Sequence, residues 1–138
     1  DSTLVQFGPV KAAFPPGWRF FAGSVGSEAL SPAGVSTSVM VLVGQFAQVP
    51  GPAAGITQAL NTYFCGTGSS AHVDQLPQRS DRSAFVGQCV GKEGPQSYVL
   101  FYEVRSSGRM VQLISTGTGQ VGLPRRELDA VALSLAFE

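Results

Sequence analysis

Few side chains in this sequence have the type and spacing that catalysis needs. Cys65 and His72 lie on one stretch of the chain, and a thiol with an imidazole could act as a nucleophile and its general base. No third group that would orient the imidazole stands out, and Cys89 offers the Cys65 thiol a disulfide instead. His72 is the only histidine and follows polar residues, so we interpret it as a solvated loop residue. The sequence therefore predicts no catalytic residues and a protein that is not an enzyme.

The two cysteines favour a structural role. They lack the C-x-x-C spacing of metal and redox sites, which favours a single Cys65–Cys89 disulfide. Such a bridge is typical of the periplasm or the extracellular space. The chain begins at Asp1 without methionine, as it would after removal of a signal peptide, although a boundary chosen for other reasons would look the same. The lone histidine and the scattered carboxylates lack the spacing of metal ligands, so no metal is expected. Asp74 and Asp81 share one loop region, which alone does not indicate a catalytic carboxylate pair, and we interpret Asp81 as a turn residue.

One glycine motif has the form of a nucleotide-binding loop. Residues 117–122 read G-x-G-x-x-G between a predicted strand and a predicted helix. That motif works inside a βαβ unit, whose second parallel strand supplies the ribose-binding acid. Here the chain ends at Glu138, one helix later, so no nucleotide or other cofactor is predicted. Anion binding at this helix start, assisted by Arg125 and Arg126, stays open.

Composition excludes several classes of partner. The 138 residues are 43% hydrophobic and 13% charged, as expected of a globular chain that buries a core. The formal net charge is zero, so no basic surface points to nucleic acid. No apolar run approaches the roughly 18 residues of a membrane-spanning helix.

The strongest structural pattern is a hairpin over residues 96–116. Two strands rich in β-branched and aromatic residues, 98–104 and 110–114, flank a loop at 106–108 that ends in glycine. In this three-residue loop Arg105 and Arg109 would face each other across the ladder. Two arginines beside a small, donor-rich tip would suit an anionic or polar partner; the alternative is that both extend into water.

The first strand of this hairpin is apolar on both faces, which places it inside a sheet that is covered on both sides. One face carries Tyr98, Leu100, Tyr102 and Val104, and the other carries Val99 and Phe101.

The remaining elements follow from turn signals and apolar periodicity. Further strands are predicted over residues 3–7, 10–14, 18–22, 28–31, 36–46, 73–80 and 83–90. Helices are predicted over about 53–65 and 124–136, and their apolar faces are formed by Ile56, Ala59, Leu60, Tyr63 and Phe64 and by Leu128, Val131, Ala132 and Leu135. Because strands and helices do not alternate, the expected fold is α+β: one domain, residues 1–138, with a mainly antiparallel sheet of about 7–9 strands and two packed helices.

The order of elements, with Phe14-Pro15-Pro16-Gly17-Trp18 leading into strands and an amphipathic helix at the end, resembles the PsbP-like α/β sandwich. That family includes envelope accessory proteins and effector chaperones, and its members generally lack catalysis. This resemblance implies a non-catalytic accessory protein, chaperone or ligand-binding module of the cell envelope.

The chain is also similar to the periplasmic immunity proteins that neutralise type VI secretion peptidoglycan amidases. In that family a loop with two adjacent serines enters the cleft of the toxin and blocks its cysteine–histidine site. The matching positions here are Ser106 and Ser107. This resemblance implies a periplasmic inhibitor whose protein partner is an amidase effector and whose binding residues are Arg105, Ser106, Ser107, Gly108 and Arg109.

Overall fold

The computed structural model describes residues 2–22, 26–43, 52–65, 69–77, 82–91, 97–106, 109–118 and 124–137. Within these ranges the strands are β1 (Thr3–Phe7), β2 (Val10–Phe14), β3 (Arg19–Ala22), β4 (Ser27–Leu30), β5 (Ser36–Val43), β6 (Ser69–Gln75), β7 (Ser83–Gly91), β8 (Ser97–Ser106), β9 (Arg109–Thr118) and β10 (Ala136–Phe137). The helices are α1 (Pro52–Ala59), the π-helix η2 (Leu60–Phe64) and α2 (Arg125–Ser134).

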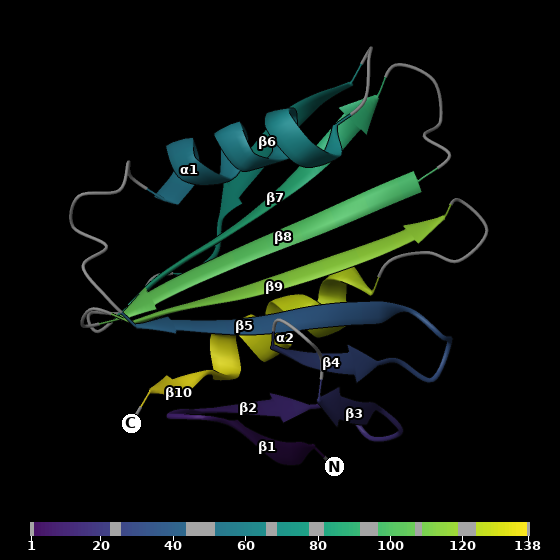
Figure 1. The fold of residues 1–138 in the computed structure, drawn as a ribbon, viewed down its shortest axis with the longest axis vertical. Coiled ribbons are helices and arrows are strands. Elements are labelled where there is room, and N and C mark those ends of the chain that lie inside the picture. Colours follow the sequence, from purple (N-terminus) through teal and green to yellow (C-terminus); the bar gives the residue numbers. More distant parts are fainter. Residues whose placement is uncertain are drawn as a thin grey trace.

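A seven-stranded sheet forms the centre of the molecule (Figure 1). Its strand order is β3-β4-β5-β9-β8-β7-β6, and the pairs between neighbours are antiparallel. β8 and β9 are ten residues long and lie inside the sheet. The predicted hairpin is therefore the structural centre of the fold, and the predicted α+β class is confirmed.

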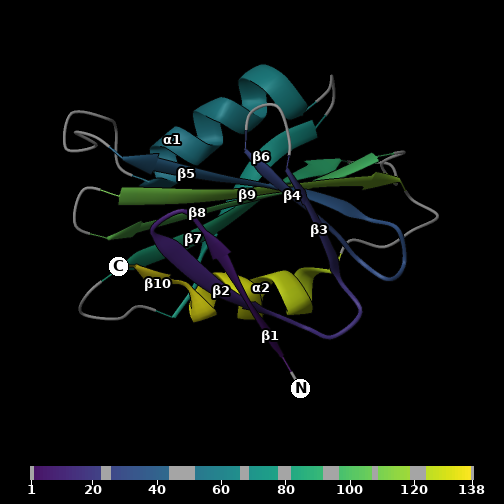
Figure 2. The same ribbon diagram turned by 60° about the horizontal axis from the view of Figure 1, so that its bottom comes forward.

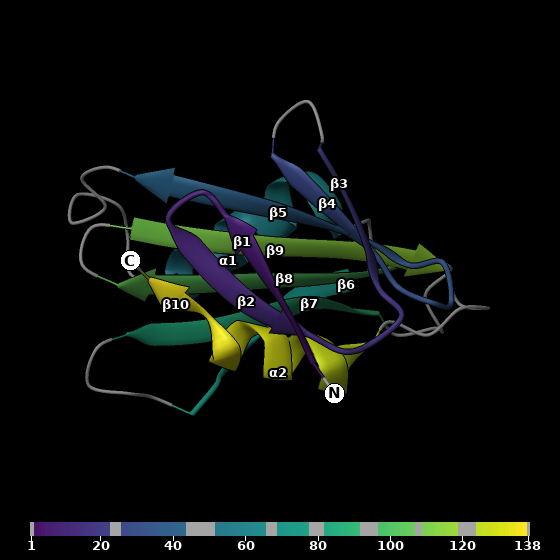
Figure 3. The same ribbon diagram turned by 90° about the horizontal axis from the view of Figure 1, so that it is seen from below.

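The two faces of this sheet are covered differently. α1 lies on one face, while α2 and a three-stranded sheet of order β1-β2-β10 lie on the other (Figure 2). Seen from below, β1, β2, β10 and α2 form a layer in front of the large sheet (Figure 3). The chain thus forms a sandwich in which β8 is covered on both sides, as its two apolar faces predict.

The larger core fills the space between the sheet, α2 and the three-stranded sheet. Leu100, Tyr102 and Val104 from β8 contribute to it, together with Leu128, Val131, Ala132 and Leu135 from α2 and its end. Four aromatic side chains from the first three strands and the segment before β3 also pack together in this core, mostly edge to face; they are Phe7, Phe14, Trp18 and Phe20.

The smaller core lies under α1. Ile56 and Leu60 are fully buried there against Val99 and Phe101 of β8. Gly87 of β7 makes this close packing possible, because a Cβ at Gly87 would lie 2.4 Å from Cγ2 of Ile56 and 2.6 Å from Cδ1 of Leu60.

The predicted face of the first helix is wrong at one residue. Tyr63 was expected to be buried, but it is 79% exposed. The reason is that the helix widens into η2, where the N–H of Cys65 donates to the carbonyl of Leu60 at 2.7 Å. This i to i+5 pattern rotates the last turn, so that Phe64 packs on Phe101, with their ring centroids 6.3 Å apart.

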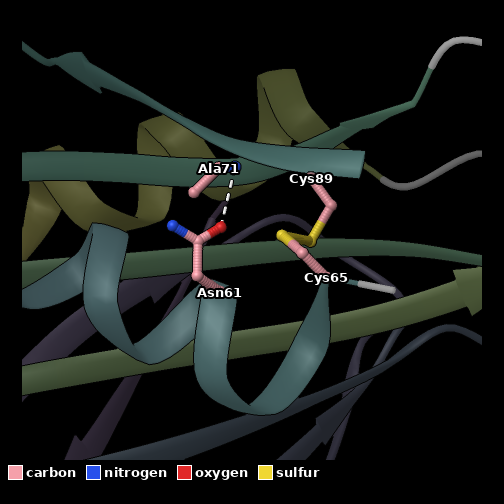
Figure 4. Close-up of a disulfide and its surroundings, with 4 residues drawn as sticks. All are labelled: Asn61, Cys65, Ala71 and Cys89. Atoms are coloured by element: carbon pink, nitrogen blue, oxygen red, sulfur yellow. Dashed lines mark hydrogen bonds between the residues drawn. A yellow bond between two sulfur atoms is a disulfide. The ribbon is translucent and has the colours of Figure 1, made fainter. Parts of the chain in front are cut away.

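The disulfide is confirmed. Cys65, directly after η2, is bonded to Cys89 of β7, with 5.4 Å between their Cα atoms. Figure 4 shows a second link nearby, in which the backbone N–H of Ala71 donates to Oδ1 of Asn61 at 3.2 Å. The end of the helix is thus attached to both β6 and β7.

Several predicted boundaries differ from the structure, and two of these differences change the interpretation of a segment. Residues 44–46 of the strand expected over 36–46 lie outside the described residues. The strand expected over 73–80 is β6, Ser69–Gln75, so His72 lies in an edge strand and the interpretation of His72 as a loop residue is wrong. The last helix ends at Ser134 instead of 136, because the chain becomes extended at Leu135 and Ala136–Phe137 pairs with β2.

Candidate functional site

The hairpin that carries the predicted binding residues has a different register from the one expected. Ser106 pairs with Arg109 and Arg105 pairs with Met110, so the connecting loop is the two residues Ser107 and Gly108. The prediction that Arg105 and Arg109 face each other is therefore wrong, because the loop is one residue shorter than a three-residue turn. Ser107 and Gly108 lie outside the described residues.

Arg105 does not extend into water. Its Nε donates to Oε2 of Glu103 at 3.0 Å, Nη2 lies 3.0 Å from the same oxygen, and the side chain is 16% exposed. Glu103 itself is 4% exposed. Burial raises the pKa of Glu103, while Arg105 and a hydrogen bond with Gln112 act in the opposite direction. The Arg105 head group is thus fixed beside the hairpin end by a neighbour two residues away on the same face.

Ser106 is half-buried at the end of β8. By strand alternation it lies on the face of Tyr102 and Val104, opposite to Arg105. Arg109 begins β9 and pairs with Val43 of β5 on its other side. The hairpin therefore presents a loop whose two flanking residues are held in the middle of a wide sheet.

A second group of polar side chains links α2 to the other face of the sheet. The hydroxyl of Tyr102 donates to Oδ1 of Asp129 at 2.5 Å, and Nε of Arg125 donates to the same oxygen at 2.7 Å. Nη2 of Arg125 lies 3.8 Å from Oδ2 of Asp74, whose Oδ1 is 3.0 Å from Nε2 of His72. Burial and Asp129 raise the pKa of Tyr102 far above its usual range, so this hydroxyl stays protonated.

These contacts are of the kind that stabilises a fold. Each charged group has a partner of opposite charge, and the tyrosine is fully buried at the centre of the larger core. His72 and Cys65 are not brought together as a nucleophile and a base, since Cys65 is in the disulfide and His72 contacts Asp74. In the part of the chain that the structure describes, no group of three His, Cys, Asp or Glu side chains could hold a metal ion.

Two residues of the glycine motif, Gly117 and Thr118, are described. Gly117 lies in β9, and residues 119–123 are outside the described ranges, as is Asp81. The helix that follows begins at Arg125, and its first hydrogen bond runs from the N–H of Leu128 to the carbonyl of Pro124 at 2.9 Å. Arg125 points to Asp129 and Asp74, so the anion site considered for Arg125 and Arg126 has lost one of its two cations to internal pairs.

An open hollow of about 370 Å³ lies at the start of α2, and no pattern in the sequence predicts it. Trp18 lies in its wall and donates from Nε1 to Oε2 of Glu127 at 3.2 Å. The nine lining residues come from three separate segments: Pro15, Pro16 and Trp18; Ser31, Pro32, Ala33 and Val35; and Pro124 and Glu127. The prolines of the first two segments predict turns at these positions, but the sequence does not predict that the two turns lie close together.

Among the described residues no helix is both long and apolar enough to span a bilayer.

Comparison with known proteins identifies the fold. No protein-family model matches the chain, and no curated protein is similar to it in sequence. The structure of CyanoP, the cyanobacterial PsbP of Synechocystis sp. PCC 6803, matches with a TM-score of 0.61 at 9% identity, over 94% of this chain and 87% of that one. The structure of LpqN, which is involved in cell envelope biogenesis of Mycobacterium tuberculosis, matches with a TM-score of 0.57 at 14% identity, over 99% of this chain and 90% of that one. The expected PsbP-like fold is thereby confirmed.

Proposed function

We propose that this protein is a non-catalytic binding protein of the cell envelope, located outside the cytoplasm. The observation that carries the proposal is the match of almost the whole chain to the PsbP-like fold, with LpqN, which is involved in cell envelope biogenesis, among the similar structures. The disulfide adds support, because such bridges persist in oxidising compartments.

The distribution of ionisable groups supports a binding role over a catalytic one. Glu103 is paired with Arg105, and Asp129 is paired with Arg125 and Tyr102. A general acid or base must instead reach a substrate proton directly or through one water. Of these contacts, the one between Tyr102 and Asp129 holds α2 on the sheet, and the one between Glu103 and Arg105 lies within β8.

A pull-down from periplasmic extract with the immobilised protein tests this proposal. We expect a bound species in stoichiometric amount, and its identity separates the two kinds of binding protein. A lipid or small molecule would indicate a ligand-binding module, and a protein would indicate an inhibitor or a chaperone. Release of products from peptidoglycan fragments by the purified chain would contradict a non-catalytic role.

A second, more specific candidate is an immunity protein that inhibits a type VI secretion peptidoglycan amidase. The observation that favours it is the construction of the β8–β9 hairpin. Two ten-residue strands in the middle of the sheet hold Ser106 and Arg109 as the last ladder pair before the loop. Flanking residues held in this way lose little conformational entropy when the hairpin end docks in a cleft.

The chemistry of the tip suits a catalytic slot that contains cysteine and histidine. A serine hydroxyl is small and can donate or accept a hydrogen bond, so Ser106 and Ser107 could engage an imidazole. Serine is under-represented among binding hot spots, so the affinity must come from a wider patch, about 800 Å² on each partner. Arg109 at the base of the loop is half-buried and can contribute to that patch.

Paired arginine substitutions test this candidate. Ser106→Arg with Ser107→Arg should weaken inhibition of the amidase by well over about tenfold, because two long charged side chains cannot enter a narrow cleft. Ser69→Arg with Ser70→Arg is the matched control, since this serine pair lies on the edge strand β6 at the opposite end of the sheet, beside Gly91. Equal inhibition by the two double variants would remove the hairpin from the mechanism.

A further inference from the structure

The hollow beside Trp18 lies far from the hairpin tip. Ser36, which follows one of its walls, pairs with Thr116 at one end of β5, whereas Val43 pairs with Arg109 at the other end. The hollow and the tip are therefore at opposite ends of the central sheet, and a ligand in one leaves the other accessible.

The walls of the hollow are rigid. Within the turn between β4 and β5, the N–H of Ser31 donates to the carbonyl of Val35, the N–H of Gly34 donates to the carbonyl of Ser31, and the N–H of Val35 donates to Oγ of Ser31, each at 2.9 Å. The turn after β2 packs against this one, since a Cβ at Gly17 would lie 3.0 Å from Cγ of Pro32. Four prolines with fixed φ complete the lining, so the hollow is formed before any ligand arrives.

The polar groups that line the hollow are mainly hydrogen-bond acceptors. Proline has no N–H to donate, and the indole N–H of Trp18 is already directed to Glu127. The lining contains one carboxylate and no cation. Across the described part of the chain, Glu127 makes no ion pair with a lysine or arginine. The hollow thus presents apolar surface and acceptors around a single negative charge.

We propose that this hollow is a docking groove for an extended segment of a partner protein that carries a lysine or arginine side chain. The aliphatic stem of the basic residue packs on Pro15, Pro16 and Pro32, and its charged head reaches the carboxylate of Glu127 at the wall. The indole of Trp18 adds a cation–π contact at the same place.

The shape of the hollow selects a peptide segment over an enclosed small molecule. Pro16, Pro32 and Ala33 are exposed on its rim, and the hollow is open to solvent along that side. A chain can therefore enter and leave without threading. Segments that are already extended, such as those with prolines beside the basic residue, lose the least entropy on binding to a rigid groove.

Trp18 is the only tryptophan, so its fluorescence reports directly on the groove. The probe is a blocked heptapeptide with a central arginine between prolines, and the matched peptide carries citrulline in place of arginine. Glu127→Gln removes the charge and keeps the shape and an acceptor for the indole. Glu28→Gln is the control variant, because Glu28 is an exposed carboxylate on the opposite face of the sheet from buried Ala29. Both variants should melt at the wild-type temperature.

We expect saturable binding of the arginine peptide that shifts the Trp18 emission. The citrulline peptide and the Glu127→Gln variant should each bind about fivefold more weakly, in line with an exposed ion pair, and Glu28→Gln should bind as the wild type. Equal binding of the two peptides would overturn the proposal, as would equal binding by the two variants. So would no binding of the arginine peptide together with binding of phosphatidylcholine vesicles, which would make the groove a lipid site.

Discussion

Tyr102 is the largest fully buried side chain of the molecule's described core. Its hydroxyl donates to Asp129 and also lies 3.2 Å from the carbonyl of Arg125, so it connects the central strand to the helix on top of it. Tyr102→Phe should lower the free energy of unfolding by about 1.5–3 kcal/mol, the range for a hydrogen bond to a charged group. Urea unfolding monitored by circular dichroism measures the change.

Tyr63→Phe is the matched control for this prediction. Tyr63 is 79% exposed, and loss of its hydroxyl should change the stability by less than about 0.5 kcal/mol. Equal effects of the two substitutions would show that the contact between Tyr102 and Asp129 contributes nothing.

Glu103 should make the stability depend on pH. Burial raises its pKa in the folded state above the usual value of 4.5, so the folded state binds the proton more tightly than the unfolded state. The resulting stabilisation is complete below the unfolded pKa and is lost as the pH rises through the folded pKa.

Glu103→Gln isolates this contribution. Between about pH 4.5 and neutral pH, the wild type should lose stability relative to the variant, as measured by urea unfolding at several pH values. If the difference in the free energy of unfolding between the wild type and the variant stays constant with pH, or changes in the opposite direction, Arg105 fully compensates the burial of this carboxylate.

At the scale of the elements, the contact between α1 and β7 depends on the absence of a side chain at Gly87. Gly87→Ala should destabilise the protein by about 1–3 kcal/mol, because the added methyl group would overlap with Ile56 and Leu60. In an Ile56→Ala background the same change should cost less, and a double-mutant cycle measures this coupling. If the effects of the two substitutions are additive, the destabilisation by Gly87→Ala does not arise from overlap with Ile56.

The disulfide should stabilise the same region through the unfolded state. It joins residues 24 apart, for which the chain-entropy model gives about 3 kcal/mol. Thermal or urea unfolding with and without a reducing agent measures this loss. A Cys65→Ala and Cys89→Ala double variant should be as unstable as the reduced wild type, and the reducing agent should not change its stability. A change would mean that the reducing agent acts on something other than this disulfide.

The sequence predicted those elements whose patterns are strong. The apolar residues on both faces of β8 correctly placed it between two covering layers, because burial on both sides demands that pattern. The predicted bounds of β6 are wrong because it is an edge strand of mostly polar residues. Ser69, Ser70 and His72 do not show the alternation of apolar and polar residues that marks a strand. The sequence did not predict the widening of the helix into η2, because these residues show no pattern that distinguishes a π-helix from an α-helix, and this widening left Tyr63 exposed.

At the scale of the whole molecule, the hairpin was predicted as the centre and the hollow was not predicted at all. A hairpin is local in sequence, so its strands and loop can be recognised together, although a loop one residue shorter changed the partner of Arg105. The hollow requires Pro15, Pro32 and Glu127 to approach one another from three distant segments. The tertiary fold brings these segments together, and no local sequence pattern predicts their proximity.

Native mass spectrometry of the protein recovered from periplasmic extract tests the account most directly. We expect a complex with a protein in a fixed ratio. It should be retained by the Ser69→Arg and Ser70→Arg double variant and lost by the Ser106→Arg and Ser107→Arg double variant. A complex that survives both pairs of substitutions would contradict docking through the hairpin. Recovery of the chain with no bound species, together with hydrolysis of peptidoglycan fragments, would contradict a binding protein altogether.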